Sequence, residues 1–285
     1  MEKAIEIKNF TKEYQEFSIR NMNLSIPKGY ITGVVGRNGA GKTTTLKGIL
    51  NMIRFDGEIC VLGMDNRSRE QEIKNLTGVV LGQDGFIEDI ALEGLLRIIR
   101  PFYREWKEPI FQTLAEKFSL SLEKKVSELS RGMRVKLSLA IALAHNARLF
   151  LLDEPTAGLD PMVRDEILEI FMNLIQDEEK TVLFSTHITS DLDKVADYIV
   201  LMENGKIIFN QPKDELLEEH MLISGEKEKL NACREALVGW KENQFGFQGL
   251  AKRNVLRETK GFLLEKPNVE QLMTYYIRGI EHECD

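Results

Sequence analysis

The sequence predicts an α/β fold built around a mostly parallel sheet, and three of its segments carry that prediction. An apolar run at 30–35 leads directly into a glycine-rich turn, after which residues 42–53 show helical spacing. Two further apolar runs, at 149–152 and 181–185, alternate with helical patterns. Continuous apolar strands that alternate with helices are typical of parallel sheets covered on both faces, because neither face then meets water.

The segments on either side of the first apolar run are expected to differ from this core. From Ile5 onward apolar and polar residues alternate, and a second extended run ends at Pro27, so an N-terminal antiparallel β subdomain is predicted. Further strands are predicted at 57–62 and 77–81. At 89–120 the apolar residues recur at helical spacing and prolines break the run, which predicts an inserted α-helical subdomain of two or three helices.

Helix starts and turns mark the rest of the chain. Residues 131–145 have a strong helical pattern. Asp160 directly before Pro161 predicts the capped start of another helix. The pair Asn204-Gly205 lies between two apolar runs and predicts a hairpin.

Two units are predicted along the chain. Residues 1–210 form the main domain, with the helical subdomain at about 86–140, and residues 211–285 form a small C-terminal α/β extension. Residues 211–213 are interpreted as a linker, and the apolar residues at 269–277 lie on one helical face. The role of the extension stays open between regulation, subunit pairing and packing against the sheet, of which packing is favoured.

Composition limits the class of protein. The net charge of -7 and the pI near 5.4 argue against a nucleic acid partner, because affinity for phosphate backbones comes from excess Lys and Arg. Cys60, Cys233 and Cys284 are far apart and odd in number, so reduced thiols are expected instead of disulfides or a zinc site. No stretch approaches the roughly 20 apolar residues that cross a bilayer, so any role at a membrane is expected to be peripheral.

The glycine-rich turn carries specific chemistry. It runs from Gly36 to Thr43 as GRNGAGKT, which matches the phosphate-loop pattern G-x-x-x-x-G-K-[ST] between a strand and a helix. Its glycines let backbone N–H groups converge on phosphate oxygens, and the helix N-terminus adds partial positive charge. Lys42 is therefore expected to reach the β and γ phosphates of a nucleotide, and the Thr43 hydroxyl is expected to bind Mg²⁺.

Two carboxylates follow the apolar run at 149–152. A phosphate loop needs a metal-positioning carboxylate on a neighbouring strand, and Asp153 is predicted to hold Mg²⁺ directly or through water. Glu154 is predicted to orient and deprotonate the attacking water. Taken alone the pair would more often be a helix cap or a solvated turn, but the phosphate loop upstream disfavours that alternative.

With these motifs in place, the chain resembles the nucleotide-binding domains of ATP-binding cassette (ABC) proteins over roughly residues 1 to 210. The resemblance implies a P-loop NTPase (RecA-like) core in which Tyr14 stacks on adenine. It also implies that Gln83 senses the γ-phosphate and Mg²⁺, and that His187 is the switch histidine at the γ-phosphate. The implied ATP-binding residues are Tyr14, Gly36, Asn38, Gly39, Ala40, Gly41, Lys42, Thr43 and Thr44.

The signature of that family, usually LSGGQ, is present here as LSRGM at 129–133. Ser130 can cap the helix that follows, and its hydroxyl with the first amides would form an anion site. In the resembled family this site binds the γ-phosphate of the ATP held by the partner subunit. Arg131 replaces a glycine and Met133 replaces a glutamine, whereas Ser130 and Gly132, the residues nearest phosphate in the family, are kept.

The resemblance also implies partners and a location. The loop containing Asp160 resembles the one through which two ABC subunits touch, so a second ABC ATPase subunit, identical or related, is expected with ATP and Mg²⁺. GRNGAGKTTT, LSRGM and DEPTAGLDP are similar to bacterial ABC-2-type export ATPases, whose transmembrane permease subunits are separate chains. The helical insert would dock these permeases at the cytoplasmic face of the membrane.

Two alternatives to a transporter are considered. A soluble ABC ATPase serving a non-transport protein machine stays open, since such proteins can have a similar length. A phosphate-loop kinase or GTPase is disfavoured, because it would need neither the 129–133 signature nor His187.

Overall fold

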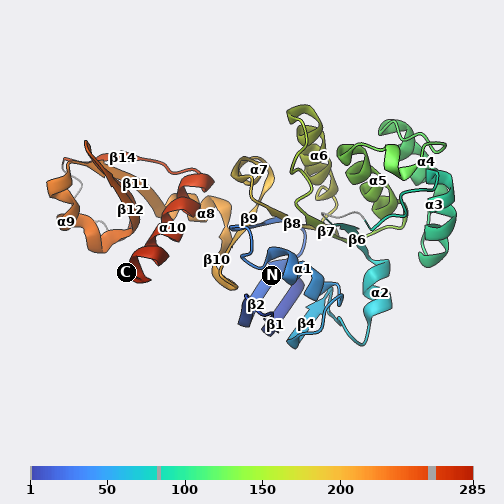
Figure 1. Ribbon diagram of the computed structural model, residues 1–285, viewed down its shortest axis with the longest axis horizontal. Helices are drawn as coiled ribbons and strands as arrows, with labels where there is room; N and C mark the ends of the chain where they lie inside the picture. Colours follow the sequence, from blue (N-terminus) through green and yellow to red (C-terminus); the bar gives the residue numbers. More distant parts are fainter. Residues whose placement is uncertain (1, 82–84, 256–260, 285) are drawn as a thin grey trace.

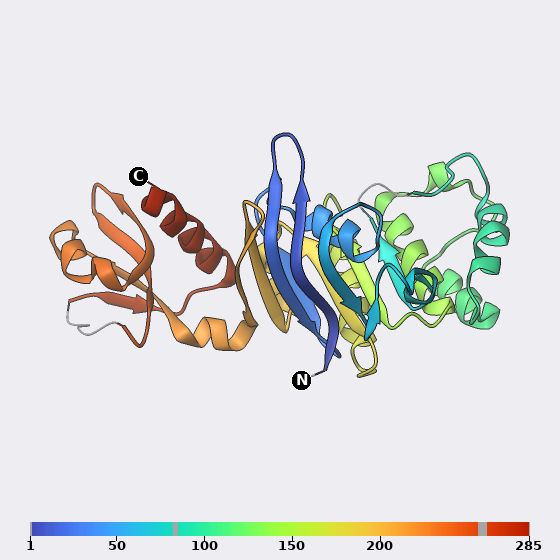
Figure 2. The ribbon, with the colours of Figure 1, turned by 90° about the horizontal axis from the view of Figure 1, so that it is seen from below.

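The protein is described by a computed structural model that covers residues 2–81, 85–255 and 261–284. Figure 1 shows a central sheet with an antiparallel sheet below it and helices above it, and a helical part and a C-terminal part at opposite ends. Figure 2 shows the same two ends from below. The predicted α/β class is confirmed. In the described part of the chain, no helix is both long and apolar enough to cross a membrane.

The central sheet places the carboxyl ends of its strands at one edge. Among the described residues it has six strands, in the order β10-β9-β3-β8-β7-β6. Neighbours run parallel, except that β10 pairs antiparallel with β9 through the predicted Asn204-Gly205 hairpin. All residues of β3 and β7 are buried, which explains their continuous apolar sequences. The strands are β3 Ile31–Val35, β6 Thr77–Val80, β7 Leu149–Asp153, β8 Thr181–Thr186, β9 Tyr198–Glu203 and β10 Lys206–Pro212.

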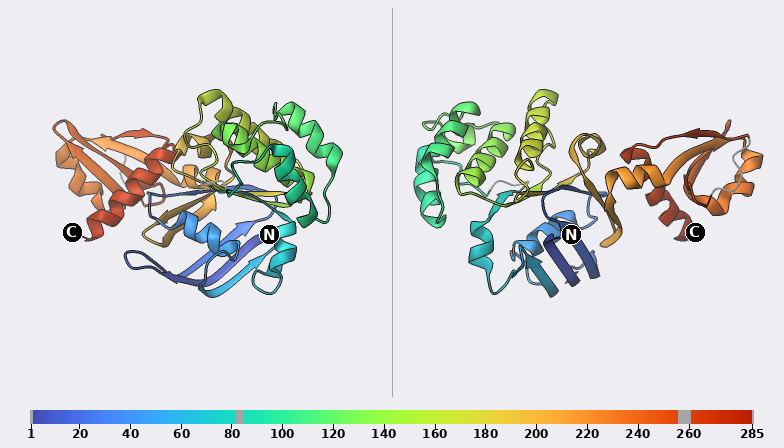
Figure 3. Two further views of the ribbon diagram at one scale, coloured as in Figure 1. Left: turned by 45° about the vertical axis from the view of Figure 1, so that its right-hand side comes forward. Right: turned by 180° about the vertical axis from the view of Figure 1, so that it is seen from behind.

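Alternate residues of each strand serve the two faces of this sheet. Phe150 and Leu152 of β7 pack with Phe171 in one core cluster, whereas Leu149 and Leu151 pack in the other. The first face is covered by α6 Pro161–Leu174 and α7 Thr189–Val195. The second is covered by α1 Lys42–Ile49, α2 Glu70–Asn75 and the antiparallel strands β1 Lys3–Glu13, β2 Ser18–Pro27, β4 Asp56–Val61 and β5 Met64–Asp65 (Figure 3).

The helical part is inserted between β6 and β7, as the spacing of apolar residues predicts. It contains α3 Leu92–Ile99, α4 Glu108–Lys117, α5 Arg131–Ala144 and two 3-10 turns, Arg100–Phe102 and Val126–Glu128. Leu96, Phe111 and Leu137 belong to a hydrophobic core of its own. Pro101 lies in the turn that follows α3, and Pro109 lies in the first turn of α4, where a missing N–H costs little.

The C-terminal part is a second antiparallel sheet, of order β12-β13-β11-β14, between two helices. Helix α10 packs on one face and α9 on the other. A side chain on Gly239 of β12 would lie 2.0 Å from the Tyr275 carbonyl oxygen of α10, so this close approach requires glycine. The elements are α8 Lys213–Glu219, β11 His220–Gly225, α9 Leu230–Cys233, β12 Leu237–Asn243, β13 Gly246–Lys252, β14 Leu263–Glu265 and α10 Val269–Cys284.

Two expectations about local structure are wrong. The predicted linker at 211–213 instead ends β10 and begins α8, so the chain enters the C-terminal part without a loop. Helix α1 ends at Ile49 and not at residue 53. Just beyond this end, Asn51 adopts a left-handed φ of 54°, which stops helical hydrogen bonding. The domain boundary at 210/211 stays a prediction.

His145 fills the junction between the helical part and the central sheet. It follows α5, is buried, and stacks on Tyr103 with ring centroids 3.8 Å apart. Its Nδ1 lies 3.1 Å from the Asn75 carbonyl oxygen, so a neutral ring can donate there. Burial lowers the pKa of His145 to about 4, because a charged ring loses its hydration at this position.

We expect His145 to make the protein less stable as the pH falls from 6.5 toward 4. The unfolded chain takes up this proton at the ordinary pKa near 6.5, whereas the folded chain resists it down to about 4. His145→Gln keeps a donor for the Asn75 carbonyl and should therefore show a weaker pH dependence of the free energy of unfolding. Urea denaturation across this pH range measures the free energy of unfolding of the variant and of the unaltered chain. An equal change of that free energy with pH in both would contradict the expectation.

Candidate functional site

Three strand ends meet at the carboxyl edge of the central sheet. β8 pairs with β3 on one side and with β7 on the other, in the registers Val35↔Thr186 and Asp153↔Ser185. The glycine-rich loop leaves β3 at this edge, the two carboxylates leave β7, and His187 follows β8. Ligands of open α/β sheets bind at this edge, so the arrangement defines a candidate site.

The loop between β3 and α1 has the conformation of an anion-binding turn. Gly39 and Gly41 have φ of 82° and 112°, values that residues with a side chain rarely adopt. Lys42 is buried, and its Nζ donates to the carbonyl oxygens of Gly36 at 2.8 Å and Arg37 at 3.2 Å. These bonds hold an ammonium group against the loop at the N-terminus of α1, where phosphate is favoured electrostatically.

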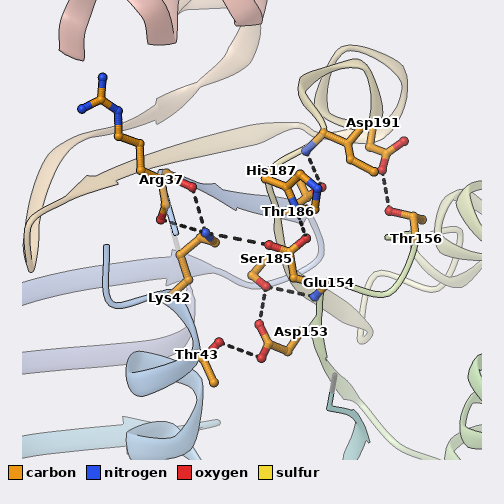
Figure 4. A network of polar contacts seen from close by, with 12 residues as sticks. Arg37, Lys42, Thr43, Asp153, Glu154, Thr156, Ser185, Thr186, His187 and Asp191 are labelled. Atoms are coloured by element: carbon orange, nitrogen blue, oxygen red, sulfur yellow. Dashed lines mark hydrogen bonds and ion pairs between the residues drawn. The ribbon is translucent and has the colours of Figure 1, made fainter. Parts of the chain in front are cut away.

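The two carboxylates contact different partners, as Figure 4 shows. Asp153 accepts a hydrogen bond at Oδ2 from the Thr43 hydroxyl at 2.8 Å. Glu154 has Oε1 3.8 Å from the Lys42 Nζ and Oε2 2.6 Å from the His187 Nδ1. The structure therefore brings the residues singled out from the loop and from the ends of β7 and β8 into one cleft.

Thr43 and Asp153 suit a magnesium ion. Both supply oxygen atoms, the donors that Mg²⁺ prefers, and a hydroxyl can bind a metal through a lone pair while its proton goes to a carboxylate. Their oxygens are 2.8 Å apart beside the phosphate loop. Mg²⁺ in such sites is commonly bound by one or two protein oxygens together with substrate phosphates, which fits this pair.

Tyr14 lies at the rim of the phosphate loop. It is 47% exposed and packs against Phe17, with ring centroids 6.5 Å apart. Both rings and residues 38–44 line one pocket of about 390 Å³. Tyr14 is predicted from the sequence and Phe17 is not, although a second aromatic residue three positions after Tyr14 is visible there.

The signature begins α5 as predicted. Ser130 caps the helix, its Oγ accepting from the Met133 N–H at 3.3 Å. A side chain on Gly132 would lie 2.6 Å from a methyl carbon of Val163, so this glycine also allows α5 to begin against α6. Arg131 has an unforeseen contact within the same chain, where its Nη2 donates to the Glu154 carbonyl oxygen at 3.3 Å.

Two other predicted residues have separate outcomes. Gln83 lies outside the described residues. Asp160 caps α6 as predicted, its Oδ1 accepting from the N–H groups of Met162 and Val163 at 3.1 Å each. Its role between subunits stays a prediction.

A buried polar network that the sequence does not predict lies behind the cleft. Asp191 of α7 is fully buried and accepts from the Thr156 hydroxyl at 2.6 Å and from the Arg164 Nε at 2.5 Å. It therefore ties the helix after His187 to the loop after Glu154. An acidic residue in the first turn of a short helix is typical of an exposed position, so no pattern in the sequence indicates that Asp191 is buried.

These features define a class of protein: a phosphate-loop enzyme in which an ammonium group, an oxygen pair that suits Mg²⁺ and a carboxylate–histidine pair lie beside one glycine-rich loop.

Comparisons with known proteins identify the family. A family model described as ABC transporter matches residues 19–157. The bacitracin transport ATP-binding protein BcrA of Enterococcus faecalis is 32% identical over 212 residues, 73% of this chain and 69% of that protein. The Nod factor export ATP-binding protein I of Rhizobium meliloti (strain 1021) is 35% identical over 228 residues, 77% of this chain and 66% of that protein. A solved ATP-binding subunit of an ABC transporter superposes with a TM-score of 0.67 and 25% identity, over 75% of this chain and 92% of that one.

The chain belongs to the ABC transporter ATP-binding proteins, and it is an ATPase. The P-loop NTPase (RecA-like) core implied by the resemblance is confirmed. A kinase or GTPase is excluded.

The Asp191 network allows a stability prediction. Asp191→Ala leaves the partly buried Arg164 guanidinium without its carboxylate and should lower the free energy of unfolding by roughly 3–5 kcal/mol. Lys194→Ala on the same helix removes a half-exposed ion pair with Asp165 and should cost less than about 1 kcal/mol. Urea denaturation measures both, and losses of similar size would contradict a structural role for Asp191.

Proposed function

We propose that this chain is the motor subunit of an exporter, which closes with a second cassette subunit over ATP and reopens after hydrolysis. The observation that supports this most directly is the Glu154–His187 pair, 2.6 Å apart, beside the buried Lys42 and the Thr43–Asp153 oxygens. Such a pair can accept a proton from water while the loop holds the terminal phosphates.

Each residue has a distinct part in this proposal. Lys42 and the loop N–H groups bind the β and γ phosphates, and Thr43 with Asp153 would hold Mg²⁺, which neutralises developing charge when bound. Glu154 accepts the proton of the attacking water. His187 holds Glu154 at Oε2 and leaves Oε1 on the side of Lys42, 3.8 Å away.

The proposed partner cassette completes the site through its signature. This chain carries one phosphate loop and one LSRGM segment, and Ser130 of that segment caps a helix N-terminus that can face an anion. Closure would then be a population shift driven by ATP contacts present only in the closed pair. Ser130 and Gly132 would supply those contacts, and Asp160 would lie in the loop between subunits.

The proposed membrane contact lies on the helical part. Phe102 is 72% exposed and lines an apolar pocket of about 200 Å³ with Tyr103, Ile99 and Phe86. Ile98 nearby is 48% exposed. An apolar hollow with protruding aromatic and aliphatic side chains suits a short helix of a permease subunit. This would place the chain at the cytoplasmic face of the membrane, as a peripheral subunit.

Export is the proposed direction of transport. One relative is named for Nod factor export, which supports export here. The alternative, an ATPase serving a soluble protein machine, predicts no permease partner.

The general-base role of Glu154 has a direct test. Glu154→Gln should keep ATP binding, lose turnover by at least about 100-fold and trap a dimer with ATP, because the amide cannot accept the proton. Steady-state phosphate release and size-exclusion chromatography with ATP measure the two effects. Lys42→Ala is the contrasting variant. It should weaken nucleotide binding itself, which calorimetry measures. Turnover of Glu154→Gln near that of the unaltered chain would remove Glu154 from this role.

The membrane contact has its own test. Phe102→Asp should remove most of the chain from membranes isolated from its native cells, because a charge cannot enter an apolar contact without cost. Phe245→Asp, at an 84% exposed position in the C-terminal part, is the matched control and should leave membrane association unchanged. Equal membrane association of both variants would contradict a contact at Phe102. Recovery of the unaltered chain with soluble proteins alone would favour the soluble-machine alternative.

A further inference from the structure

We propose that Ser185 is a positioning residue for both carboxylates of the site, orienting Asp153 toward the metal and holding Glu154 in a strained backbone conformation. The inference rests on the proposed function, since it requires Asp153 to hold Mg²⁺. Ser185 itself is not expected to touch ATP or the metal.

The hydroxyl of Ser185 joins the two carboxylate residues. Ser185 is the penultimate residue of β8 and is fully buried. Its Oγ donates to Asp153 Oδ1 at 2.5 Å and accepts from the Glu154 backbone N–H at 3.0 Å (Figure 4). One side chain thereby contacts two successive residues of the neighbouring strand end.

For Asp153, this bond helps to fix the orientation of the carboxylate toward the phosphate loop. Ser185 engages Oδ1 and Thr43 engages Oδ2, so the carboxylate plane is held from both sides. The terminal torsion of an aspartate is broad, and an unheld carboxylate rotates easily. A hydrogen bond to an ionised group is about twice as strong as a neutral one, so the loss of Ser185 would free that rotation.

For Glu154, the bond supports an uncommon backbone conformation. Its φ of 51° lies in the left-handed region, which costs a non-glycine residue on the order of 1 kcal/mol or more. The Glu154 N–H donates to both the Ser185 carbonyl oxygen, at 3.1 Å, and the Ser185 Oγ. This turn sends the Glu154 side chain to Lys42 and His187 while Asp153 faces Thr43.

A merely structural role makes a different prediction from a positioning role. If Ser185 only satisfies buried polar groups, its loss lowers stability and leaves the benefit of Mg²⁺ for nucleotide binding intact. If it orients Asp153, its loss weakens nucleotide binding only when Mg²⁺ is present. The informative quantity is therefore the magnesium gain, defined as the affinity for nucleotide with excess Mg²⁺ divided by the affinity in EDTA.

The experiment titrates the purified full-length chain with mant-ATP, a fluorescent ATP analogue, under both conditions. Ser185→Ala should reduce the magnesium gain by about 10-fold or more, the scale typical of losing a group that orients a metal ligand, and should leave the EDTA affinity unchanged. Ser185→Thr retains a hydroxyl and should restore the gain. Thr181→Val removes another fully buried hydroxyl of β8, one that accepts from the Gly29 N–H. This variant should keep the magnesium gain.

Asp153→Asn separates failure of the inference from failure of the proposed function. If Asp153→Asn loses the magnesium gain and Ser185→Ala keeps it, the inference about Ser185 is wrong while Asp153 retains its role. If Asp153→Asn also keeps the gain, the proposed metal role is wrong and the inference falls with it. Equal loss of the gain in Thr181→Val would likewise overturn the inference, because the effect would then be general to β8.

Discussion

The position of β8 between β3 and β7 is the constraint on which the site depends. Because all three strands run parallel and are in register, their carboxyl ends lie at one edge of the sheet. The phosphate loop, the carboxylates and His187 leave from those ends and need only short connections to meet. The described connections that leave these three strand ends are short, which limits the entropy cost of forming the cleft.

Buried hydrogen bonds then fix what the strands bring together. Asp191 holds the loop after Glu154 to the helix after His187, and Ser185 holds the turn between Asp153 and Glu154. In a low-dielectric interior such bonds are strong when satisfied and costly when broken. At this sheet edge, backbone pairing therefore places the site residues, and side-chain hydrogen bonds orient them.

The parts at the two ends of the central sheet join it differently. The helical part has its own hydrophobic core and contacts the carboxyl end of β7 through Arg131 and the Glu154 carbonyl oxygen. The C-terminal part shares the central core, where Leu272 of α10 belongs to the same hydrophobic cluster as Leu192 of the neighbouring helix α7. The linker predicted at 211–213 proved wrong because proline and glutamine there continue an edge strand, where the missing N–H of Pro212 is tolerated.

The sequence by itself determined the fold class, the phosphate loop, the carboxylate pair and the caps at Ser130 and Asp160, because each depends on residues close together in the chain. Tertiary structure alone decided the contacts of Ser185 and Asp191. Ser185 bonds Asp153, 32 positions away, and Asp191 bonds Thr156, 35 positions away. A serine in a strand and an aspartate in a helix are ordinary residues until packing removes water from them. Only then does each hydroxyl or carboxylate require a specific partner, and the folded chain supplies it.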